Sequence, residues 1–195
     1  MRVVRALAFA GSLRSDSWNR KLLRLAIEAA KPAGLDVIEF ELAGIPLYNA
    51  DEEARGFPPP VEALRQALRD AAALIIATPE YNHSIPGVLK NAIDWASRPP
   101  NAFDGKVAAI LGTSPGPLGT VHAQHALRPV LSAVNVLVLP SPRITIARAA
   151  QAFEPDGNLK DPHVAAQLHA LMQRLADTTR ALTGGPAPVV AASRA

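Results

Sequence analysis

The 195-residue sequence contains no cysteine. This absence excludes disulfide bonds, thiolate zinc sites, iron–sulfur clusters, CxxC redox pairs and cysteine nucleophiles. Any redox chemistry must therefore come from a bound cofactor.

Long apolar runs are also absent. The longest uninterrupted one, residues 71–77, is far shorter than the ~20 residues of a membrane-spanning helix. Near the N-terminus Arg5 leaves an apolar run of residues 6–10, which is shorter than the roughly 7 residues of a minimal signal-peptide core. We therefore expect a cytoplasmic protein without a membrane partner.

The charge balance is modest, because 20 Lys and Arg residues face 17 Asp and Glu residues for a net charge of +3. The basic residues are scattered singly, so we expect no nucleic-acid partner. With 49% hydrophobic and 19% charged residues, the composition is that of a globular protein. The length favours one domain, which we place at residues 1–183. Residues 184–195 are small and include proline, and predict a disordered tail.

Apolar runs of strand length alternate with helical patterns, which is typical of βα units that build a parallel sheet with helices on both faces. The predicted strands are 3–10, 36–42, 73–78, 107–112 and 134–139. The predicted helices are 19–31, 61–71, 88–96, 120–134 and a final helix from Val164 to Leu182. Residues 46–60 and 141–162 are rich in proline and predict ordered surface excursions.

Ligands of such sheets bind at the carboxyl ends of the strands, so three junctions are candidates. The first, residues 11–19, contains hydroxyls, Arg14 and a predicted helix start, all of which suit a phosphate. A plain capped turn, with Ser17 or Asn19 as the cap, fits the same residues. The junction lacks GxGxxG and GxxxxGK[ST], so it matches neither a dinucleotide fingerprint nor a Walker loop.

The second junction, residues 78–87, follows the third predicted strand and reads TPEYNHSIPG. Two prolines and a glycine restrict its backbone, which can present main-chain groups to the edge of a flat heterocycle beside Tyr81. A proline-delimited turn, with Pro86 near the start of the next helix, accounts for part of this pattern in any case. We interpret His83 as exposed or hydrogen-bonded, and not as catalytic.

Together the two motifs resemble the flavodoxin-like NAD(P)H-dependent FMN reductases, a family that includes soluble quinone and chromate reductases. The resemblance is carried by GSLR with Ser17 and Asn19, and by PEYN, Ser84, PG and LKNAIDW. It implies a three-layer α/β fold with a five-stranded parallel sheet in the order 2-1-3-4-5. It also implies FMN as cofactor, with NADPH or NADH as co-substrate.

Site residues follow from the same resemblance. It implies that the FMN phosphate is bound by Ser12, Arg14, Ser17 and Asn19. It implies that the isoalloxazine is lined, largely through backbone groups, by Pro79, Glu80, Tyr81 and Asn82. Ser114, after the fourth strand, would complete the site, whereas the sequence around Gly116 departs from the family pattern.

The implied activity is two-electron transfer from NAD(P)H to quinones, flavins or other acceptors, including chromate and azo compounds, by ping-pong kinetics. No protein residue is assigned as catalytic, because the chemistry belongs to flavin N5. The resemblance also implies a homodimer or homotetramer. The alternative is a flavodoxin-type electron carrier or FMN-binding redox sensor, against which the absence of net acidity and the presence of Arg14 both count.

Other polar residues receive structural interpretations. His122 and His125 lie three apart on a predicted helix, but no third ligand is near them in sequence, so we predict no metal site. Lys90 and Asp94 are spaced for an i,i+4 surface pair, and Trp18 is interpreted as packing.

Overall fold

The computed structural model describes residues 3–184, so the tail predicted at 184–195 lies outside the described residues except for Gly184. The strands are β1 (Val4–Ala10), β2 (Leu35–Glu39), β3 (Ala73–Ala77), β4 (Val107–Thr113), β5 (Leu137–Val138) and β6 (Ile144–Ile146). The helices are α1 (Trp18–Ala30), α2 (Ala50–Glu53), α3 (Pro59–Asp70), α4 (Gly87–Ala96), α5 (Val121–Ala133), α6 (Ala149–Ala152) and α7 (Pro162–Thr183).

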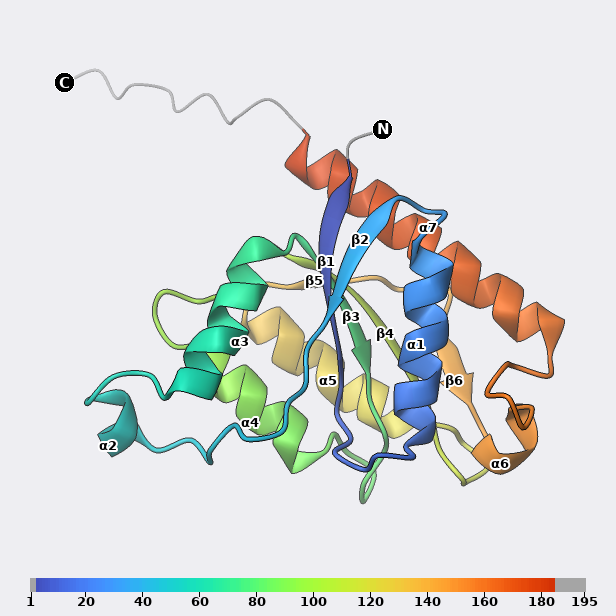
Figure 1. The fold of residues 1–195 in the computed structure, drawn as a ribbon, viewed down its shortest axis with the longest axis horizontal. Helices are drawn as coiled ribbons and strands as arrows, with labels where there is room; N and C mark the ends of the chain where they lie inside the picture. Colours follow the sequence, from blue (N-terminus) through green and yellow to red (C-terminus); the bar gives the residue numbers. More distant parts are fainter. Residues whose placement is uncertain (1–2, 185–195) are drawn as a thin grey trace.

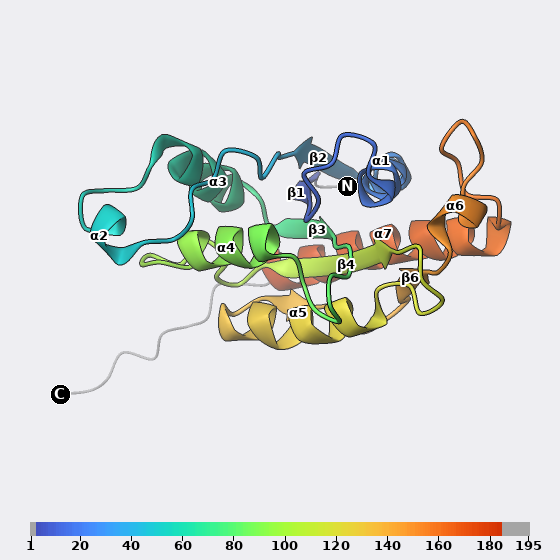
Figure 2. The same cartoon turned by 90° about the horizontal axis from the view of Figure 1, so that it is seen from below.

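All strand pairs are parallel, and the sheet order is β2-β1-β3-β4-β5, which confirms the predicted fold. Helices cover both faces, as Figures 1 and 2 show. The side chains of β3 explain this arrangement because they alternate between two cores: Ile75 packs with residues of α1 and α7, whereas Leu74 and Ile76 pack with residues of α3, α4 and α5. Every residue of β3 is buried, as expected of the central strand.

The fifth strand was predicted in the right place but too long, and a sixth strand was missed. Instead of one strand at 134–139, the chain forms β5 beside the start of β4 and β6 beside its end. Residues 134–136 belong to the exit from α5, where Asn135 has a φ of 61°. Two prolines, Pro140 and Pro142, then lie between β5 and β6, and proline cannot donate a ladder hydrogen bond.

The two proline-rich excursions are ordered, but each contains a short helix that the sequence patterns did not reveal. In the first, Asn49 caps α2 by accepting a hydrogen bond from the Asp51 N–H at 2.9 Å. The second contains α6 as well as β6. Among residues 3–184, no helix is both long and apolar enough to cross a lipid bilayer.

Candidate cofactor site

A cleft of about 160 Å³ opens at the carboxyl ends of β1, β3 and β4, where the three predicted junctions meet. The loops that follow β1 and β3 lie side by side below the sheet in Figure 1. The cleft is lined by Ser12, Arg14, Ser17, Trp18, Asn19, Pro79, Glu80, Tyr81, Thr113, Ser114 and Pro115. All predicted site residues except Asn82 are therefore brought together. Sites that enclose a drug-sized ligand have roughly 300 Å³ or more, so this cleft is smaller than one that encloses such a ligand entirely.

The β1–α1 loop offers unpaired donors to this cleft. Ser12 and Ser17 are only 6% and 4% exposed, yet their hydroxyls make no hydrogen bond among residues 3–184. Ser17 occupies the N-cap position of α1 without a side-chain capping bond, which leaves the first N–H groups of the helix available. Free hydroxyls and N–H groups at a helix start, beside a guanidinium, form a donor set that fits a phosphate.

Arg14 is the guanidinium of this loop, and within residues 3–184 it makes no ion pair or hydrogen bond. Its nearby acid, Asp16, is paired elsewhere, because Lys21 Nζ lies 2.6 Å from Asp16 Oδ1. The hydrogen bond from Lys21, with its charge and a smaller contribution from the charge of Arg14, lowers the pKa of Asp16. The positive charge of Arg14 thus remains available to a ligand.

Asn19 serves the fold through its side chain. Its amide donates to the Thr113 carbonyl at 2.8 Å and accepts from the Thr113 N–H at 2.9 Å. These two bonds join α1 to the end of β4 inside the protein, where Asn19 is 4% exposed. The side-chain amide of Asn19 is thus already paired, whereas its main-chain N–H, in the first turn of α1, is left available.

We expect Asn19→Ala to lower the free energy of unfolding by about 2 kcal/mol, because it leaves both main-chain groups of Thr113 without their buried partner. Urea unfolding followed by circular dichroism measures this change. Ser17→Ala is the matched control, since its hydroxyl has no partner in the described chain, and it should leave stability nearly unchanged. Equal stability of the Asn19 variant and the parent protein would contradict the structural role.

The β3–α4 loop contains a tight turn at its tip. The N–H of Tyr81 donates to the Ser84 carbonyl, and the N–H of Ser84 to the Tyr81 carbonyl, both at 3.0 Å. Between them Asn82 and His83 have φ values of 51° and 62°, the conformation of a type I′ turn. This turn places Asn82 outside the cleft lining and leaves Tyr81 on its rim, 53% exposed. His83 is exposed, as the sequence indicated.

Glu80 anchors this loop to a neighbouring helix. Its Oε2 accepts hydrogen bonds from the N–H groups of His122 and Ala123, at 2.9 and 3.0 Å, in the first turn of α5. A carboxylate at a helix N-terminus is stabilised by unpaired N–H groups and by the helix dipole. The side chain is thus engaged by α5, which leaves the main chain of the loop to face a ligand.

The β4–α5 loop closes the third side of the cleft. The Ser114 hydroxyl donates to the Gly119 carbonyl at 2.5 Å, and the Ser114 N–H donates to the Ile146 carbonyl of β6 at 3.1 Å. Gly116 lies outside the cleft lining, and its carbonyl accepts from the Arg148 N–H at 3.0 Å. The unexpected strand β6 therefore supports the loop that carries Ser114.

Three lining residues were not predicted as site residues: Trp18, Thr113 and Pro115. Trp18 packs as expected, because its ring stacks on Phe153 with centroids 5.2 Å apart, but it also lines the cleft. Thr113 and Pro115 flank the predicted Ser114. Their position directly after the predicted fourth strand was the sequence feature that could have indicated them as site residues. The expected surface pair is confirmed, with Lys90 Nζ 2.7 Å from Asp94 Oδ1.

The sheet is doubly wound and parallel, and the β1–α1 and β3–α4 loops meet at one edge of it. The first loop offers donors that suit a phosphate, and the second offers main-chain groups that suit the edge of a flat ring. This combination defines a flavodoxin-like cofactor-binding protein. Residues 4–151 match the sequence profile described as NADPH-dependent FMN reductase. The chain belongs to this family.

Relatives extend the similarity over nearly the whole chain. It is 47% identical over 182 residues to an NAD(P)H-dependent FMN reductase of Pseudomonas aeruginosa, which covers 93% of this chain and 98% of that protein. It is 38% identical over 172 residues to a 2-hydroxy-1,4-benzoquinone reductase of a Burkholderia species, covering 87% and 93% of the two chains. The solved structure of FerB, a flavoenzyme NAD(P)H:(acceptor) oxidoreductase from Paracoccus denitrificans, superposes with a TM-score of 0.84 at 35% identity, covering 92% and 98% of the two chains.

Proposed function

We propose that this protein is an FMN-dependent oxidoreductase that uses NAD(P)H to reduce quinones. The observation that carries this proposal is the donor set of the β1–α1 loop. Ser12, Ser17 and Arg14 all line the cleft without protein partners for their side chains in the described chain. Family membership and the quinone and FMN reductases among its relatives support the same activity.

Ser12, Arg14, Ser17 and the first turn of α1 hold the phosphate in this proposal. The main chain of Pro79, Glu80 and Tyr81 borders the ring, with Asn82 shaping the turn and Ser114 closing the opposite side. FMN when bound supplies hydride transfer at its N5 atom. The protein holds the ring, places N–H donors beside it and leaves the open rim to the nicotinamide and the acceptor in turn, so both substrates use one position.

The activity is tested on the protein loaded with FMN. Under anaerobic conditions, NADH or NADPH should bleach the flavin absorbance, and addition of a benzoquinone should restore it with turnover. Initial rates should give parallel lines in double-reciprocal plots, as ping-pong kinetics require. Protein that binds FMN but is not reduced by either nicotinamide would instead be an electron carrier or sensor, and the proposed activity would be wrong. Parallel assays with chromate and an azo dye define the acceptor range.

The proposal extends to the organisation of the protein. We propose that residues 1–183 form one FMN-binding domain in a cytoplasmic homodimer or homotetramer. The excursion that precedes α3 supports association, because Leu47 in it is 82% exposed while the adjacent Tyr48 is tied by its N–H to Asn91 Oδ1 at 2.8 Å. Light scattering on the eluting protein measures its mass, and a monomer would contradict this part.

A further inference from the structure

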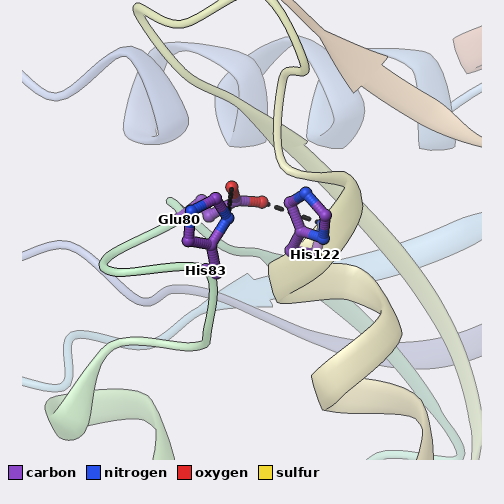
Figure 3. A group of neighbouring side chains, drawn as sticks. All are labelled: Glu80, His83 and His122. Carbon is purple, nitrogen blue, oxygen red and sulfur yellow. Dashed lines mark hydrogen bonds and ion pairs between the residues drawn. The ribbon is translucent and has the colours of Figure 1, made fainter.

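Two histidines and one carboxylate from separate parts of the chain converge beside the cleft. Glu80 and His83 lie in the β3–α4 loop, and His122 lies in the first turn of α5. One ligand atom from each residue lies within 4.8 Å of the others, and Figure 3 shows the three side chains facing one another. Neither the sequence motifs nor the proposed flavin chemistry uses this convergence.

The carboxylate is oriented for a ligand by the hydrogen bonds it already makes. Glu80 Oε2 accepts both bonds from α5, whereas Oε1 lies 3.9 Å from His83 Nδ1 and makes no hydrogen bond within residues 3–184. The Glu80 side chain is only 13% exposed, so its position is fixed by its surroundings. Such outer hydrogen bonds orient metal-binding carboxylates in known sites.

His83 lies beside the free oxygen, and His122 lies beside His83. The rings of His83 and His122 meet edge to face, with centroids 4.7 Å apart. His83 is 77% exposed and can rotate, whereas Glu80 and His122 are attached to the start of α5. Zinc–ligand bonds of about 2.0–2.1 Å at tetrahedral angles place ligand atoms about 3.3 Å apart. Since the three atoms lie within 4.8 Å of one another, the longest separation has to shorten by up to about 1.5 Å.

The backbone of the turn favours the same arrangement. Asn82 and His83 both adopt positive φ, which is uncommon for residues other than glycine and costs local strain. This conformation directs the His83 ring back toward Glu80 and α5, as Figure 3 shows. The turn thus places a potential ligand beside the two others.

We propose that Glu80, His83 and His122 bind one divalent transition-metal ion of the Zn²⁺ class, with its remaining position taken by water. Two imidazoles and one carboxylate are a common ligand set for this class. The ion joins the turn at residues 81–84 to the first turn of α5, at the rim of the cleft. The site does not depend on the proposed function, since its three ligands are side chains, whereas this loop borders the proposed ring with its main chain.

Isothermal titration calorimetry with zinc chloride, on the protein as purified with its cofactor, tests the site. We expect one Zn²⁺ per chain. His83→Asn, which suits the positive φ of the turn, and His122→Ala each remove a direct ligand. Loss of a residue that only supports a ligand weakens metal binding by up to about 100-fold, so each of these variants should weaken Zn²⁺ binding by at least about 100-fold. Glu80→Gln should weaken it too while still accepting the bonds from α5. His125→Ala, one helical turn further along α5 and outside the group, is the matched control and should bind as the parent does.

The proposal is overturned if Zn²⁺ binds the His83 and His122 variants as tightly as the parent, or if His125→Ala loses binding equally. Absence of stoichiometric binding to the parent also overturns it. X-ray absorption of the zinc-loaded protein adds an independent measurement, with two imidazoles expected in the parent and one in either histidine variant. Neither measurement requires enzymatic turnover, so failure of the metal site and failure of the proposed activity remain distinguishable.

Discussion

Replacing Arg14 with alanine is expected to weaken FMN binding by about 100-fold, because a charge-assisted pair with phosphate contributes roughly 3 kcal/mol. The loss concerns binding rather than folding, since Arg14 is exposed and makes no ion pair or hydrogen bond within residues 3–184. Titration of the apoprotein with FMN, followed by quenching of flavin fluorescence, measures the change. The thermal unfolding midpoint of the apoprotein should stay the same.

Arg24→Ala is the matched control, because Arg24 is an exposed arginine of the adjacent helix α1 that lies outside the cleft. It should bind FMN as the parent does. Arg14→Lys should fall between the two, since lysine keeps the charge but loses the planar pair of donors. Unchanged affinity of Arg14→Ala would refute the assignment of this loop to the phosphate.

Gly112→Ala is expected to reduce the free energy of unfolding by about 3 kcal/mol or more, the upper range for overpacking a buried site. Gly112 lies in β4, where an added Cβ would sit 2.9 Å from Thr120 Cβ and closer still to Thr120 Oγ1 and the main-chain oxygen of Thr78. The Thr78 oxygen belongs to the neighbouring strand segment, so no side-chain rotation relieves the contact. Chemical unfolding, or the yield of soluble protein if the variant does not fold, measures the effect.

Gly87→Ala provides the contrast. Gly87 begins α4, and an added Cβ there meets no atom of the described part of the chain within 4 Å. Alanine should be neutral or slightly stabilising at this position, since it restricts the unfolded chain. Equal stability of the two alanine variants would contradict the close approach of β4 to Thr78 and Thr120.

The parts of the structure that local patterns determine were predictable. The apolar run of β3 and the periodicity of α1 each fix an element and its buried face, and parallel order then places the three junctions at one edge. The cleft follows from that order, which is why nearly all of the predicted site residues line it.

The remaining features depend on contacts between residues far apart in sequence. The side chain of Asn19 pairs with Thr113, 94 residues away, and Glu80 binds the amides of α5 more than 40 residues away. No periodicity within either segment signals such bonds. For the same reason the sequence suggested only His125, its neighbour along the helix, as a partner for His122 in a metal site. In the fold His122 instead lies beside His83.

The divided outer strand has a consequence for solubility. A long, regular sheet edge exposes a row of unpaired N–H and C=O groups, onto which a second chain can add a strand and begin aggregation. Within residues 3–184, β5 pairs only with Val107 and Ala108, and β6 only with residues from Leu111 to Thr113. The prolines between these short strands further interrupt the edge. By dividing this strand, the chain supports the β4–α5 loop and at the same time offers no long template for intermolecular β-sheet growth on that side.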